Sequence, residues 1–75
     1  MKPVKFRYAQ QVQPLNGQIT HEFPNGLLLE SWRPWSLADQ SQFPQADRQA
    51  CGDSLVVNRI DGSVFIVPLD EMPGL

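Results

Sequence analysis

Apolar and polar residues alternate along the first third of the chain, which is typical of strands with one buried face. Val4, Phe6 and Tyr8 share one face of a strand predicted over residues 4–12. Residues 18–23 alternate in the same way and predict a second strand.

Turn signals separate these strands from each other and from a third. Asn16-Gly17 is a pair that tolerates positive φ, and the Pro-Asn-Gly sequence at 24–26 marks the next turn. Residues 27–32, LLLESW, then predict a third strand. We therefore expect a meander of three antiparallel strands over residues 1–32.

The pattern changes over residues 33–53, where glutamines and prolines are frequent and apolar residues are few. Ser36 and Asp39 have the spacing of a capping box, which begins a helix. Gly52 is placed to end another helical turn over residues 45–51. We expect one long loop with one or two short helical turns, and loops of this length are usually functional or mobile.

Residues 54–69 contain two apolar runs separated by Asp61-Gly62, which is a strong hairpin signal. A two-residue loop would pair Val56 with Val67 and Asn58 with Phe65. Both faces of this hairpin are largely apolar. One face can cover the core, and the other requires a cover from the first meander, the tryptophan segment or another protein chain.

Five short strands predict a mostly β fold, either a small curved antiparallel sheet or an SH3- or OB-like barrel with a long central loop. The 75 residues predict one domain, made of the meander (1–32), the loop (33–53) and the hairpin with its tail (54–75).

A domain of this size buries only roughly 60% of its unfolded surface, so it often relies on a disulfide, a metal or a partner. Cys51 is the only cysteine, and Cys51 and His21 are the only strong zinc ligands, so no disulfide, metal or cofactor is expected. A protein partner or a homodimer is therefore the remaining means of stabilising the domain, if one is needed.

The location of the protein is predicted from what the chain lacks. The first 17 residues contain no apolar run typical of a signal peptide. No stretch approaches the roughly 18 apolar residues of a membrane span. The lone thiol is typical of a reducing compartment, so we expect a soluble, cytoplasmic protein without membrane contact.

Short motifs that could indicate an enzyme each lack a required part. The QACG sequence at 49–52 overlaps a caspase-type signature, but Asp53 replaces its final glycine. His21-Glu22 begins a zinc-protease motif that has no second histidine. We expect no enzyme, and a small enzyme that uses Cys51 or His21 is an alternative.

The net charge of −2 disfavours binding to nucleic acid, which needs phosphates neutralised by basic residues. A dimeric nucleic-acid-binding regulator is nevertheless the main alternative. Its contacts would be Lys2, Lys5, Arg7 and Arg59.

The sequence GDSLVVNRIDGSVFIVPLDEM at 52–72 resembles the hairpin half of swapped-hairpin transcription factors and antitoxins. The resemblance covers 21 of the 75 residues. It implies a dimeric β-barrel that binds DNA, with the DNA contacts falling on Lys2, Lys5 and Arg7.

Both tryptophans lie in ESWRPW at 30–35. We expect Trp32 to point inward from the end of a strand. Pro34 favours an extended backbone at Arg33 and places Trp35 at the mouth of the loop. We expect at least one exposed tryptophan.

Tryptophan and arginine are enriched at interface hot spots. We therefore predict a protein-binding surface formed by Trp32, Arg33, Trp35 and Phe43. The predicted function is a small non-catalytic binding protein that acts as a regulatory, inhibitory or accessory factor. Phages and other mobile elements commonly encode proteins of this kind.

Overall fold

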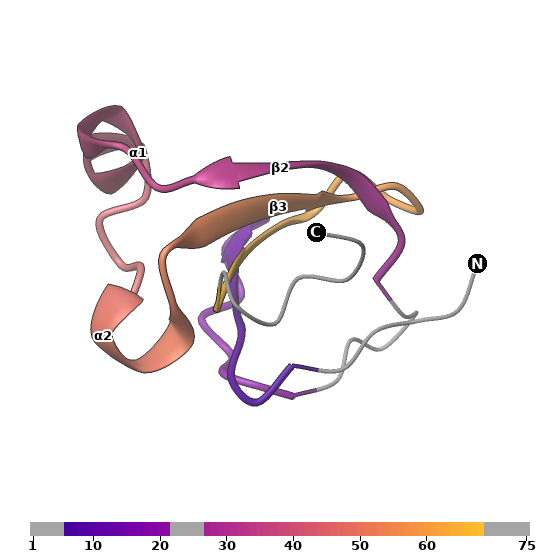
Figure 1. Ribbon diagram of the computed structural model, residues 1–75, viewed down its shortest axis with the longest axis horizontal. Coiled ribbons are helices and arrows are strands. Elements are labelled where there is room, and N and C mark those ends of the chain that lie inside the picture. Colours follow the sequence, from indigo (N-terminus) through magenta and orange to yellow (C-terminus); the bar gives the residue numbers. More distant parts are fainter. Residues whose placement is uncertain (1–5, 22–26, 69–75) are drawn as a thin grey trace.

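Four strands form one open antiparallel sheet with the order β1-β4-β3-β2 (Figure 1). The computed structural model describes residues 6–21 and 27–68, so the predictions for Val4 and for the turn at 24–26 lie outside the described residues. The strands are β1 (Gln10–Gln13), β2 (Leu29–Pro34), β3 (Ser54–Asn58) and β4 (Val64–Val67). Two short helices, α1 (Leu37–Gln42) and α2 (Arg48–Cys51), connect β2 to β3. The mostly β class is confirmed, whereas the described chain forms four strands in an open sheet rather than five or a barrel.

The N-terminal region departs most from the expected alternation. Arg7 and Tyr8 form a bend, so Phe6 and Ala9 are both buried while Tyr8 is 46% exposed. The strand predicted over residues 4–12 is therefore regular only in β1. Residues 18–21 meet β1 at a single bridge between Gln10 and Ile19, so the predicted second strand is not regular there, and its residues 22–23 lie outside the described residues.

The β3–β4 hairpin has a longer loop than the predicted two residues. Val56 pairs with Phe65, and the Asn58 amide donates to the Ser63 carbonyl, so residues 59–62 form the loop. The backbone amide and the hydroxyl of Ser63 both donate to Asp61 Oδ1, at 2.9 and 2.6 Å, and stabilise this longer turn. The register differs from the expected one by two residues, so every side chain keeps its predicted face.

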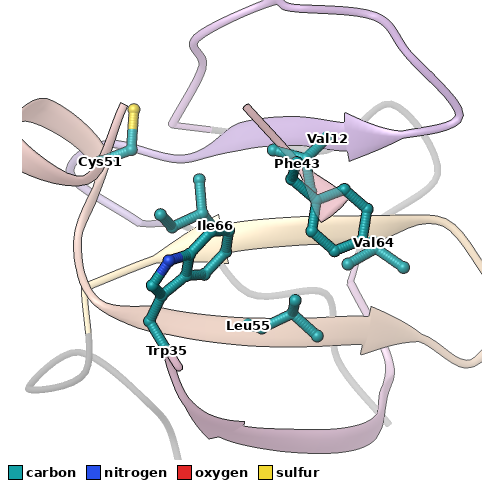
Figure 2. Packing of buried hydrophobic residues seen from close by; sticks show 7 residues of the cluster. All are labelled: Val12, Trp35, Phe43, Cys51, Leu55, Val64 and Ile66. Atoms are coloured by element: carbon teal, nitrogen blue, oxygen red, sulfur yellow. The ribbon is translucent and has the colours of Figure 1, made fainter. Parts of the chain in front are cut away.

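The two faces of the sheet carry separate apolar clusters. On the first, which we call the coil-covered face, Val56, Phe65 and Val67 pack with Phe6, Ala9 and Leu27. On the second, the helical face, the segment with the two helices provides the cover (Figure 2). That cluster contains Val12, Trp35, Phe43, Cys51, Leu55, Val64 and Ile66. The expectation that both hairpin faces need a cover is confirmed, and the tryptophan segment covers the helical one.

The helical cover has well-defined ends. Ser36 and Asp39 form the predicted capping box of α1, and Gly52 ends α2 as expected. The Asp47 side chain accepts from the Ala50 amide at the start of α2. These contacts begin α1 and end α2 where the sequence pattern places them, whereas α2 begins at Arg48 rather than at the predicted residue 45.

Gly52 also has a packing role that the sequence does not reveal. Its φ is +112°, and a Cβ at this position would lie 2.4 Å from the backbone of Val67 and of Pro68. The end of α2 therefore touches the end of β4 at a distance that only glycine permits.

A pair of glutamines ties the helical cover to the sheet. Gln10 Nε2 donates to the Gln45 carbonyl at 3.1 Å, and Gln10 Oε1 accepts from the Asp47 amide at 2.7 Å. In return, Gln45 Nε2 donates to the Val12 carbonyl at 3.2 Å. The buried amide of Gln10 is thus paired at both ends, as a buried polar group requires.

Candidate functional site

The two tryptophans of the 30–35 segment differ in burial, and the expected assignment is reversed. Trp32 is 37% exposed and Trp35 is 8% exposed. Pro34 ends β2, and the Trp35 amide donates to the Asp53 carbonyl at 2.7 Å. This places the Trp35 ring in the cluster on the helical face, 6.1 Å from the Phe43 ring centre. The prediction of at least one exposed tryptophan is confirmed, but by Trp32.

Of the four residues of the predicted protein-binding surface, only Trp32 and Arg33 reach the outside. Phe43 follows α1 and is buried with Trp35. Because both of these rings pack in the core, a partner has no direct access to most of their surface. A contact role for Trp32 and Arg33 stays a prediction.

Arg33 is held in place by a carboxylate that sequence reasoning treated only as a helix cap. Its Nη1 and Nη2 atoms each donate to an oxygen of Asp39, at 2.5 Å, while half of the Arg33 side chain remains exposed. Asp39 Oδ2 also accepts from the amide and the hydroxyl of Ser36. The bond from Arg33, assisted by those from Ser36, holds the pKa of the buried Asp39 carboxyl well below its ordinary value.

On the outer edge of β2, Trp32 directs both a backbone N–H and a backbone C=O away from the sheet. The amide of Asn58 bonds Ser63, so by antiparallel alternation Val56 exchanges its bonds with Phe65. Trp32 lies opposite Val56 and therefore directs its own N–H and C=O away from the sheet. Over residues 6–21 and 27–68, no strand pairs with this edge (Figure 1).

The opposite edge of the sheet is closed. There, the outward N–H of Gln11 donates to the Gln18 carbonyl at 3.4 Å. The Gln11 carbonyl accepts from the Gly17 amide at 3.3 Å. The segment that failed to form a regular strand thus covers the β1 edge.

The residues predicted for nucleic-acid contact are only partly described. Arg7 lies in the bend before β1, and Arg59 lies in the loop between β3 and β4; both are exposed. Lys2 and Lys5 lie outside the described residues. The structure therefore does not define a basic surface that includes all four.

Cys51 and His21 lie in different surroundings. Cys51 is fully buried in the cluster on the helical face, and this burial, with a smaller effect of Asp47, raises the pKa of its thiol. His21 is exposed, and its ring packs against the Tyr8 ring in a T-shaped arrangement with 5.8 Å between the ring centres. A raised thiol pKa disfavours the thiolate that nucleophilic chemistry requires. No cluster of three metal-ligating side chains occurs within the described part of the chain.

A scan against protein-family models finds no match for this chain, and searches of curated proteins and of solved structures return none either. Neither helix in the described ranges has the length and apolar character needed to cross a bilayer. The candidate site therefore rests on the geometry around Trp32.

Proposed function

We propose that this protein is a small non-catalytic binding protein whose contact surface is the outer edge of β2, with Trp32 and Arg33 as its main side chains. It acts through protein–protein contact as a regulatory, inhibitory or accessory factor. The observation that carries the proposal is the coincidence, at Trp32, of an exposed indole with an outward-directed N–H and C=O.

The arrangement of Arg33 supports this proposal. Its guanidinium is already fixed by two bonds to Asp39, so little side-chain entropy is lost when a partner binds beside it. Tryptophan and arginine are also the residue types most often found at hot spots. The buried free thiol of Cys51 favours a reducing compartment, and we propose the cytoplasm as the site of action.

A capture experiment from lysate of the host cell tests this function. Immobilised wild type, Trp32→Ala and Ile60→Ala are compared, with bound proteins identified by mass spectrometry. Ile60 is the matched control because it is apolar, 49% exposed and in the loop between β3 and β4. Circular dichroism confirms that each variant is folded.

We expect one or more proteins to be retained by wild type and Ile60→Ala and lost, by at least tenfold, with Trp32→Ala. Binding of the purified partner to the same three proteins then measures the loss directly. Equal retention by all three variants would contradict a contact surface at Trp32.

A further inference from the structure

We propose that the β2 edge also pairs with a second copy of this chain, antiparallel and with Trp32 opposite Trp32 of the second copy. This inference rests on the proposed function in that it uses the same surface. It names a second copy of the chain as the occupant of that surface and specifies which residues of the two copies face each other.

The usable part of the β2 edge is short. At one end, the pairing of β2 with β3 shifts register between Leu29 and Ser31, which marks a bulge. At the other end, Pro34 has no N–H to donate. Trp32 is the residue between these limits that directs both of its backbone groups outward.

Such an edge suits a two-fold contact better than a long foreign strand. Strand addition gains its affinity from a row of backbone bonds, and β2 offers few. On a two-fold axis, Trp32 and its copy exchange both N–H···O=C bonds, so the two edges satisfy each other with identical geometry.

The side chains agree with this register. Residues in a bonded antiparallel pair have Cα atoms about 5.5 Å apart with side chains on the same face, so the two half-exposed indoles would cover each other. Arg33 would face Ser31 of the second copy. Because Asp39 already neutralises each Arg33, the contact brings no uncompensated like charges together.

The assembly would also be closed. The other edge of each sheet is occupied by the bonds of Gln11 with Gln18 and Gly17. Pairing through β2 therefore joins two sheets into one and leaves no equivalent strand edge for a third copy within residues 6–21 and 27–68. A dimer, rather than a fibre, is the expected product.

Sedimentation velocity from low-micromolar to near-millimolar concentration tests the proposal with wild type, Trp32→Lys and Ile60→Lys. We expect wild type and Ile60→Lys to convert from monomer to dimer, and Trp32→Lys to remain monomeric across the whole range. Circular dichroism checks that all three are folded. A wild type that stays monomeric, or a Trp32→Lys variant that dimerises as wild type does, overturns the proposal.

Amide hydrogen exchange of wild type provides a second test that needs no variant. Exchange of the Trp32 amide should slow at least tenfold between dilute and concentrated samples, while the Ser63 amide, bonded to Asp61, should not change. A Trp32 rate that does not depend on concentration overturns the register.

The two proposals fail in different ways. A monomer that loses its lysate partner on Trp32→Ala overturns the dimer and leaves the proposed function standing. A wild type that forms the dimer, but whose lysate partners are retained equally by Trp32→Ala, overturns the proposed function and leaves the dimer standing.

Discussion

The two faces of the sheet are built from alternate residues of the same two strands, yet they are covered in different ways. On the helical face, the cover consists of two capped helices that polar contacts tie to the sheet. On the coil-covered face, Phe6, Ala9 and Leu27 pack onto the hairpin from segments without regular structure.

This difference indicates how precisely each cover must fit. Apolar burial is non-directional, because its energy depends mainly on the area removed from water. A hydrogen-bonded cap or a close backbone contact through glycine adds a requirement for position, since its energy depends on distance and angle. We therefore expect the largest effects of substitution on the helical face.

Gly52→Ala should have the largest effect. The added methyl would overlap the backbone of Val67 and Pro68, and a φ of +112° disfavours any side chain. We expect a loss of more than about 4 kcal/mol, enough to unfold much of the protein. Gly17→Ala is the matched control, because φ is +70° there but no atom lies within 4 Å of the added group. Its expected cost in urea unfolding is about 1 kcal/mol, and equal costs would contradict a close contact at Gly52.

The two tryptophans provide the next comparison. Trp35→Ala removes a buried ring from the helical face and should cost about 3–5 kcal/mol. Trp32→Ala removes a partly exposed ring at the sheet edge and should cost about 1 kcal/mol. Urea unfolding at low protein concentration, where a dimer is absent, gives both values. A larger loss of unfolding free energy for Trp32→Ala than for Trp35→Ala would show that the sheet edge, not the helical cover, stabilises the sheet.

Asp39→Asn should have a smaller effect and one that depends on pH. The variant keeps one side-chain oxygen as an acceptor, so it loses one bond from Arg33 and weakens the other, and we expect it to cost about 1–3 kcal/mol at neutral pH. The folded-state pKa of Asp39 is lowered, so its contribution is complete above the unfolded value of about 3.9 and is lost as pH falls from there toward the folded-state pKa.

Wild type and Asp39→Asn should therefore differ less at pH 3 than at pH 7 in urea unfolding. Asp53→Asn is the control, because Asp53 forms an exposed ion pair with Arg48 at 2.9 Å. Its expected cost is below about 1 kcal/mol. A gap between wild type and Asp39→Asn that widens at low pH would contradict the assigned direction.

Cys51→Ala should have the smallest effect of the substitutions in the apolar cluster on the helical face, about 1 kcal/mol, because it removes one small apolar group. The thiol itself should react with iodoacetamide much more slowly in the folded chain than in urea. Burial and a raised pKa both reduce the thiolate that reacts. Rapid alkylation of the folded chain would instead favour the alternative in which Cys51 is a catalytic residue.

The parts of the fold that could be predicted depend on local signals. The capping box at Ser36, the helix end at Gly52 and both hairpin faces are each specified by residues close in sequence. The hairpin loop is longer than the Asp61-Gly62 pair predicts. The longer turn depends on bonds from Ser63 to the Asp61 side chain, which compete with the two-residue turn that Asp-Gly favours. The bend at Arg7 and Tyr8 has no comparable local signal.

The candidate site was harder to predict because it depends on strand order. The local pattern suggests that Trp32 points inward, and it does lie on the coil-covered face opposite Val56. It is exposed because β2 is an edge strand, a property of the sheet rather than of the segment. Likewise, the Arg33–Asp39 pair joins the end of β2 to α1 and follows from the direction in which the chain turns after Pro34.

The strand order has a consequence for synthesis of the protein on the ribosome. The two outer strands, β1 and β2, emerge first, and the two central strands that they pair with emerge last. Neither early strand has its ladder partner until β3 and β4 have left the exit tunnel. The nascent chain therefore cannot assemble the sheet stepwise, and most of it must stay unfolded until the central hairpin appears.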